Sequence, residues 1–251
     1  MVASVFAPTT RPVTSVIYHL HGGGMIIGNR FTGLDHVLDW ALEHGAVVIS
    51  PEYRLAPEFP APTPVEDAYA GFVWAAENSA ELGAGPDRIL LIGTSAGGGL
   101  AAGVTLLARE RSGPVAKAQM LLSPMLDDRD ETVSSRQYTQ TGSWSRESND
   151  TGWHALLGDR RKTDAVDPAS APARATDLSD LPPAFIDVGS AEVFRDEDVS
   201  YASRLWEAGV QAELHVWAGG FHIFDGAAPF AALSRAAVTA RDSWIERTLA
   251  R

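Results

Sequence analysis

The sequence contains no cysteine among its 251 residues. This absence excludes disulfides, zinc sites built on thiolates, iron–sulfur clusters and a cysteine nucleophile. No apolar run approaches the length of about 18 residues that a membrane-spanning helix needs. The first twenty residues carry only Arg11 as a charged side chain and are interrupted by Pro8 and Pro12, unlike a secretory leader. A cytoplasmic location is therefore expected.

Positive charge is also scarce. The 20 Lys and Arg residues face 32 Asp and Glu residues, which gives a formal net charge of −12 at pH 7. Nucleic-acid phosphates and anionic membranes repel such a protein, so neither a nucleic-acid partner nor membrane insertion is expected. With 45% hydrophobic residues the chain can bury a core, and its length permits one large α/β domain or two small ones.

Short runs rich in β-branched residues alternate with longer helical patterns, as in βαβ units built on a mostly parallel sheet. The predicted strands are Ala3–Ala7, Val13–Leu20, Ala46–Pro51, Arg88–Gly93, Ala118–Ser123, Ala184–Gly189 and Ala212–Trp217. The predicted helices are Leu34–His44, Pro64–Leu82, Ala96–Arg111, Asp196–Ala208 and Pro229–Leu249. We expect the first two strands to form a hairpin. Residues 127–177 are polar and are predicted to form a partly helical, cap-like insertion within a single domain over residues 1–251.

Local signals predict how two of these helices begin. Thr63 is expected to be an N-cap, with Pro64 at the first helical position and Glu66 completing a capping box. Asp196 is expected to be the N-cap of the helix that follows it.

The strongest functional signal is Gly93-Thr94-Ser95-Ala96-Gly97, between a strand and a helix. A sharp turn from strand to helix strains the central residue, and flanking glycines let the neighbouring backbone pass. The Ser95 hydroxyl is then exposed at a helix N-terminus, whose N–H groups favour developing negative charge. A phosphate-binding turn is the alternative, but the glycine and lysine pattern of such loops is absent.

A second signal, His21-Gly22-Gly23-Gly24, follows the strand Val13–Leu20. Ester hydrolysis places negative charge on the carbonyl oxygen in the transition state, and fixed backbone N–H groups stabilise that charge. The N–H groups of Gly23 and Gly24, or of Gly22 and Gly23, are predicted to form this oxyanion hole together with that of Ala96.

A serine nucleophile needs a base, usually an imidazole. His222 lies in the loop after the last predicted strand. This position agrees with the chain order Ser, acid, His of hydrolases that carry a G-x-S-x-G serine. We interpret His215, within that strand, and His154, within the insertion, as structural.

Three carboxylates lie near the end of the preceding strand. Asp187 comes before the strand end and is expected to point into the sheet, and Asp196 is explained as a helix cap. Glu192 lies in the turn itself, where a carboxylate would hold the imidazole in the right tautomer. Glu192 is therefore the predicted acid.

Further motifs follow the same order along the chain. The complete series is His21–Gly24, Glu52–Glu58, Val65–Ala68, Gly93–Gly98, Leu181–Ala184, Arg195–Glu197 and Gly220–His222. Together these segments resemble the hormone-sensitive-lipase-like (family IV) carboxylesterases of the α/β-hydrolase fold. The resemblance implies an eight-stranded sheet with helices on both faces, a Ser-acid-His triad and hydrolysis of short-chain acyl esters.

The chain departs from the family pattern in several places. The family acid is commonly Asp where this chain has Glu192, and Thr94 replaces a common Asp. Only twenty residues precede the HGGG motif, so the first sheet strand and the N-terminal part of the cap are expected to be missing. This predicts an open pocket and an exposed sheet edge through which the protein forms a homo-oligomer. Arg54 and Glu58 are expected to form an ion pair.

The predicted function is acyl transfer in two steps through an acyl-enzyme on Ser95, on a small-molecule ester and without cofactor or metal. The predicted pocket walls are Met25, Thr94, Trp144, Trp153 and Phe221, with ordinary packing an equal alternative for the two tryptophans.

Other interpretations stay open at this point. An amidase or deacetylase would use the same three residues, and a non-catalytic ligand-binding protein would keep only the fold. The short N-terminus is also compatible with an inactive fragment. A metal pair on His19 and His21 is the weakest alternative, because no third ligand lies at metal spacing.

Overall fold

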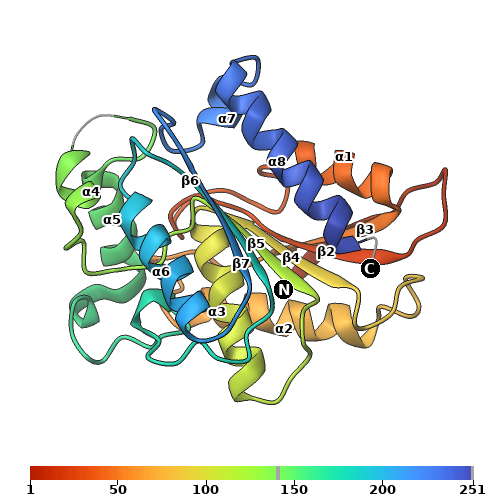
Figure 1. Cartoon of the computed structure of the whole chain (residues 1–251). Helices are drawn as coiled ribbons and strands as arrows, with labels where there is room; N and C mark the ends of the chain where they lie inside the picture. The colour runs from red at the N-terminus through yellow and green to blue at the C-terminus, as the bar shows by residue number, and fades with distance from the viewer. Residues whose placement is uncertain (140–141, 250–251) are drawn as a thin grey trace.

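Helices pack on both faces of one sheet in the computed structural model, which describes residues 1–139 and 142–249 (Figure 1). The strands are β1 (Val2–Phe6), β2 (Ser15–Leu20), β3 (Ala46–Glu52), β4 (Ile89–Thr94), β5 (Ala118–Leu122), β6 (Ala184–Gly189) and β7 (Ala212–Trp217). The helices are α1 (Asp35–His44), α2 (Thr63–Glu77), α3 (Ala96–Glu110), α4 (Val133–Gln137), α5 (Arg146–Leu157), α6 (Arg195–Glu207), α7 (Phe224–Ala227) and α8 (Ala232–Leu249), with short 3₁₀ turns η1 (Gly158–Arg160) and η2 (Pro172–Arg174). No helix in the described ranges has the length and apolarity to cross a lipid bilayer.

The strand order in the sheet is β1-β3-β2-β4-β5-β6-β7. All neighbouring strands are parallel except β1, which pairs antiparallel with β3 in the register Val2↔Glu52 to Phe6↔Val48. The predicted hairpin between the first two strands is wrong, because β2 pairs with β3 on one side and β4 on the other and so has no free edge. The described residues form seven strands, one fewer than the family resemblance implies.

Two apolar layers enclose the sheet, and alternate side chains of each inner strand enter different layers. On β2, Val16 and Tyr18 join the layer beneath α2, α3 and α6, whereas Ile17 joins the layer beneath α1 and α8. Figure 1 shows these two sets of helices on opposite sides of the sheet. Because β2, β4, β5 and β6 are buried along almost their whole length, their sequences are mostly apolar and do not alternate between apolar and polar residues.

The predicted capping box of α2 is wrong. The helix begins at Thr63, its N-cap is Pro62, and no side chain caps it. Glu66 instead accepts two hydrogen bonds from Arg111, just beyond the end of α3, at 2.6 and 2.8 Å. The carboxylate of Glu66, which the local pattern assigned to the capping box, therefore forms a long-range ion pair between neighbouring helices instead.

Two further expectations for local ion pairs and caps fail for the same reason. Asp196 lies inside the first turn of α6, where its carboxylate accepts hydrogen bonds from the Ser134 N–H at 2.7 Å and from Arg195 Nε at 2.7 Å. Arg54 pairs with Asp67 through two hydrogen bonds of 2.8 Å, not with Glu58. Ser134 and Asp67 are partners supplied by the tertiary fold, whereas Arg195 is the chain neighbour of Asp196.

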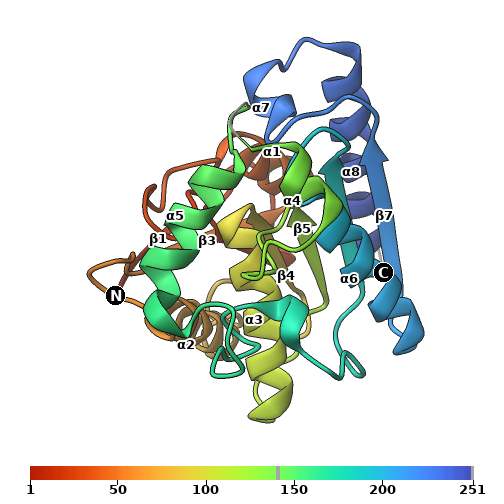
Figure 2. The same cartoon turned by 90° about the vertical axis from the view of Figure 1, so that its left-hand side faces the viewer.

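The polar segment between β5 and β6 contains α4, α5, η1 and η2, and its helices α4 and α5 face the viewer in Figure 2. Buried carboxylates hold it together: Asp128 accepts from Arg174 at 2.5 and 3.0 Å, and Asp130 pairs with Arg161. Asn149 also donates to Asp130 at 2.7 Å, while burial raises the pKa of Asp130 to about 6. The segment is thus partly helical, with ion pairs in place of an apolar core of its own.

Asp198 on α6 is an unusual buried acid. Its side chain is fully buried, and neither of its oxygens has a hydrogen-bond partner in the described part of the chain. Burial raises the pKa of Asp198 well above its ordinary range, and the nearby carboxylate of Glu197 raises it further. The folded chain therefore holds this proton more tightly than the unfolded chain does, so this group lowers stability as pH rises above the unfolded pKa of about 4.

Replacing Asp198 with Asn, which has nearly the same shape and cannot ionise, is expected to stabilise the protein in a pH-dependent way. Near pH 4 the melting temperatures of D198N and wild type should agree. Above pH 4 the variant should become progressively more stable than the wild type, by about 1.4 kcal/mol for each pH unit up to the raised pKa of Asp198 in the folded chain. Thermal unfolding across this pH range measures the difference, and a difference that does not grow with pH would contradict the assignment.

Candidate active site

Ser95 occupies the sharp turn between β4 and α3, with φ 57° and ψ −121°. The glycines around it are required by contact: a Cβ on Gly97 would collide with the Leu20 carbonyl oxygen, and a Cβ on Gly93 with the Gly97 carbonyl oxygen. The Ser95 N–H donates to the Leu122 carbonyl at 2.8 Å. The strained turn expected from the sequence is present, and it follows the carboxyl end of a central strand.

His222 faces Ser95 from the loop after β7. Its Nε2 lies 3.0 Å from Ser95 Oγ, and its Nδ1 lies 2.6 Å from Glu192 Oε2. Because a carboxylate only accepts hydrogen bonds, Nδ1 carries the proton and Nε2 presents a lone pair to the serine. All three side chains are buried. The structure thus brings together the three residues that the sequence singles out, in the order that proton transfer from Ser95 requires.

Glu192 is fixed at both oxygens. Its Oε1 accepts from the Gly189 N–H at 2.7 Å and from Ser123 Oγ at 3.0 Å, while Oε2 accepts from His222. These contacts fix the position of the longer glutamate side chain. Sequence reasoning missed Ser123; the available signal was its position directly after β5, at the same edge of the sheet as Ser95.

The rejected carboxylates and histidines lie elsewhere. Asp187 on β6 is buried and accepts from Arg241 Nε at 2.8 Å and Trp217 Nε1 at 3.1 Å. His215 stacks on Trp217 with ring centroids 5.2 Å apart, and His154 is exposed on α5. Asp196 binds Ser134 and Arg195, as described above.

The HGGG loop runs directly beside Ser95, since a Cβ on Gly22 would lie 3.4 Å from the Ser95 Cβ. Gly23 and Gly24 have φ of 121° and 60°, values that L side chains rarely adopt. Within the described ranges, the N–H groups of Gly22, Gly23, Gly24 and Ala96 donate to no protein atom. These groups are free to stabilise an oxyanion formed next to Ser95.

His19, on β2, and His21, directly after β2, both have structural partners. His21 stacks on Tyr53 with ring centroids 4.2 Å apart, and its Nδ1 lies 2.7 Å from the Gly22 carbonyl. His19 Nδ1 bonds Ser50 at 3.2 Å. Burial lowers the pKa of His19 to about 3 and lowers that of His21, so both rings are neutral. Among the described residues, no group of three side chains is arranged to hold a metal ion.

The polar segment between β5 and β6 contacts both the HGGG loop and the loop that carries His222. The Trp144 indole packs against Gly24 so closely that a Cβ there would collide with its ring, and its centroid lies 6.4 Å from that of His222. Ser143 donates a hydrogen bond to the His222 carbonyl oxygen. Neither contact has a local sequence signal, because Ser143 and His222 are 79 positions apart.

The other predicted wall residues differ in exposure. Phe221 is 37% exposed and Thr94 is partly exposed. Trp153 is completely buried and Met25 is 1% exposed, and both side chains belong to the apolar core. As pocket walls these two residues stay predictions.

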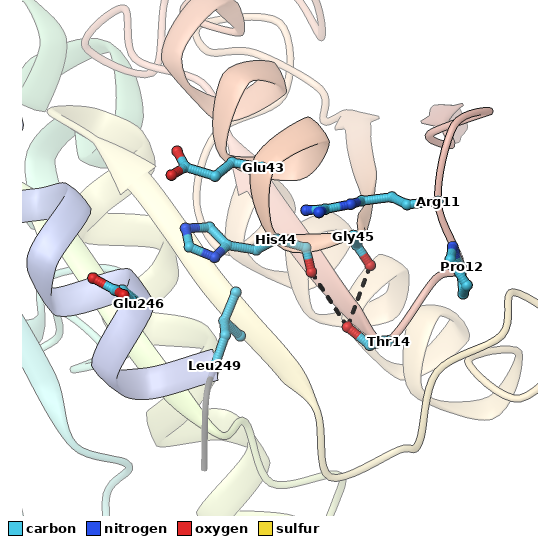
Figure 3. Close-up of a pocket in the computed structure, with 8 residues that line it drawn as sticks. All are labelled: Arg11, Pro12, Thr14, Glu43, His44, Gly45, Glu246 and Leu249. Atoms are coloured by element: carbon cyan, nitrogen blue, oxygen red, sulfur yellow. Dashed lines mark hydrogen bonds between the residues drawn. The ribbon is translucent and has the colours of Figure 1, made fainter.

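A separate hollow of about 460 Å³ lies at the other end of the strands (Figure 3). Glu43, His44 and Glu246 line it, and Thr14 Oγ1 donates to the His44 carbonyl at 3.3 Å. β2 and β3 begin here. Ligands of open α/β sheets bind at the carboxyl ends of the strands, where Ser95, rather than this hollow, is found.

The parallel sheet, the strained serine and its histidine define an α/β hydrolase. A family model described as alpha/beta hydrolase fold matches residues 17–226. The chain is 34% identical to esterase LipI and 35% identical to carboxylesterase NlhH of Mycobacterium tuberculosis, over 84% and 82% of its length. It spans about two thirds of these relatives, 67% and 65%.

A solved bacterial heroin esterase is similar in structure as well as sequence. The TM-score is 0.93 at 36% identity, over 98% of this chain and 84% of that one. The chain therefore belongs to the α/β-hydrolase family, in the hormone-sensitive-lipase-like branch that its motifs resemble.

Proposed function

We propose that this protein is a serine carboxylesterase that hydrolyses short-chain acyl esters. The observation that carries the proposal is the continuous connection from Ser95 Oγ through His222 to Glu192, with separations of 3.0 and 2.6 Å. The names of the relatives, esterase and carboxylesterase, support the same reaction class.

In the first half of the reaction, Ser95 Oγ forms a bond to the ester carbonyl carbon while its proton passes to His222 Nε2. The carbonyl oxygen becomes an oxyanion, which accepts hydrogen bonds from the Ala96 N–H and from two glycines of the HGGG loop. Collapse of this intermediate breaks the ester C–O bond, and His222 returns the proton to the departing alcohol.

In the second half, water attacks the acyl-enzyme and gives a proton to the same imidazole. The carboxylic acid leaves, and Ser95 recovers its hydrogen. Glu192 stays ionised in both halves and stabilises the imidazolium that forms on His222. Gly189 and Ser123 satisfy the second carboxylate oxygen, so Glu192 stays aimed at the imidazole.

Trp144 supports the preference for short acyl chains. Its ring is half-buried, rests on Gly24, and approaches the position of a Cβ on Gly152 at 3.5 Å. The indole therefore occupies space beside the oxyanion loop, and we propose that this space is the acyl side of the pocket.

The remaining features of the proposal concern partners and location. The partner is a small-molecule ester, with no nucleic acid or membrane insertion, and the location is cytoplasmic. A homo-oligomer would form through the sheet edge at β1, where Val2 and Val5 are exposed. Light scattering over a range of concentrations tests this, and a strict monomer throughout would contradict it.

Replacing Ser95 with Ala is expected to reduce hydrolysis of p-nitrophenyl acetate by about 10⁴-fold or more, because the nucleophile is lost. Circular dichroism and the melting temperature should match those of the wild type. Ser200, which is exposed on α6, provides a matched control, and S200A should keep full activity. Full activity in S95A would refute the proposal.

Replacing Trp144 with Ala is expected to open the acyl side of the pocket. The ratio of kcat/KM for p-nitrophenyl octanoate to that for the acetate should rise about tenfold, since modest changes in an apolar pocket are worth roughly 1–3 kcal/mol. Trp74, exposed on α2, supplies the control variant W74A, which should leave the ratio unchanged. An unchanged ratio in W144A would show that the ring does not limit chain length.

A further inference from the structure

A buried cluster of three charges lies behind the candidate active site and has no part in the proton transfer. Arg241 on α8 is 4% exposed; its Nε donates to Asp187 Oδ2 at 2.8 Å, and its Nη1 donates to Asp225. Asp187 is 1% exposed, and the Asp225 side chain is 16% exposed. Burying charges is costly unless each has a partner, so these residues behave as one unit.

One partner of Arg241 lies next to the groups that hold Glu192. Asp187 is two residues before Gly189, whose N–H donates to Glu192. The main-chain carbonyl of Asp187 accepts the N–H of Ser123 at 2.7 Å, and the hydroxyl of Ser123 is the other donor to the same oxygen of Glu192. Fixing Asp187 therefore fixes both supports of the acid.

The other partner lies on the histidine side. Asp225 is three residues after His222, on the four-residue helix α7. Figure 1 shows α7 beside the first turns of α8, and the two helices are in contact. Trp217, at the end of β7 before the histidine loop, also donates to Asp187 at 3.1 Å. The segments on both sides of His222 are thus linked to the same buried cluster.

We propose that Arg241 is a positioning residue for the proposed hydrolysis. Its guanidinium links the strand that supports Glu192 to the helix that follows His222, and so maintains the 2.6 Å contact between their side chains. Arg241 touches neither the ester nor the reacting atoms. This inference rests on the proposed function.

The link acts on kcat rather than on KM. If it is lost, the imidazole spends less time aligned with Ser95 and Glu192, while the pocket that binds the ester is unchanged. A second link limits the loss, because the Ala191 N–H donates to the Gly220 carbonyl at 2.8 Å and joins the same two loops. The expected reduction in kcat is therefore about tenfold rather than complete.

The test must separate positioning from stability, since removing Arg241 alone leaves two aspartates without their cation. The triple variant R241M/D187N/D225N removes all three charges together with the ionic link, and D225N alone removes only the ionic part of the link on the histidine side. D225N is expected to fold because its side chain is partly exposed and the Arg241–Asp187 pair remains. The control is E213Q, which breaks the exposed ion pair between Glu213 and Arg247 of α8.

Steady-state hydrolysis of p-nitrophenyl acetate and the melting temperature are measured for each protein. D225N and the triple variant should lose about tenfold in kcat with KM within about twofold of wild type, and E213Q should lose nothing. R241K, which keeps the charge but not the planar fork, should recover part of kcat relative to the triple variant.

Wild-type kcat in folded D225N would overturn the inference, whether or not the triple variant folds. The inference would also be overturned if E213Q lost as much kcat as D225N and both losses followed the melting temperature. The loss of kcat would then reflect destabilisation of the fold rather than loss of the Arg241 link. If the wild type hydrolyses no ester, or S95A hydrolyses it as fast, the proposed function fails and the inference fails with it.

Discussion

The close backbone approach at the turn between β4 and α3 is the constraint on which the rest of the site depends. Gly97 lies against the carbonyl of Leu20, so the end of β2 and the start of α3 leave no room for a side chain between them. In this turn Ser95 has a positive φ, and the HGGG loop lies beside it. The proposed nucleophile and the free N–H groups proposed to stabilise its oxyanion therefore lie in one closely packed region.

Elements defined by short-range patterns were predictable from the sequence. The serine turn, the HGGG loop and the choice of Glu192 and His222 each follow from residue type and position relative to a strand end. The pairing of β1 with β3, the Glu66–Arg111 pair and the Ser123 support of Glu192 were not predictable. Each depends on a partner distant in sequence, and a local pattern carries no information about which of several competing partners the fold brings close.

Apart from Asp198, several buried carboxylates of this acidic chain have individual partners. Asp128 has Arg174, and Glu197 accepts the N–H groups of Leu126 and Asp127 at 2.8 and 3.1 Å. Glu192 accepts three hydrogen bonds, one of them from His222, so both of its carboxylate oxygens have partners. In the proposed mechanism, the burial of Glu192 would strengthen its interaction with the imidazolium formed on His222.

The central claim is that Ser95 is the single activated nucleophile of the chain. Reaction with a fluorophosphonate, followed by mass spectrometry of the digested protein, tests it directly because this reagent bonds covalently only to serines activated in this way. The account predicts one adduct, on the peptide that contains Ser95, and its loss when His222 is replaced by Ala. No adduct on the wild type, or an adduct on a different serine, would contradict it.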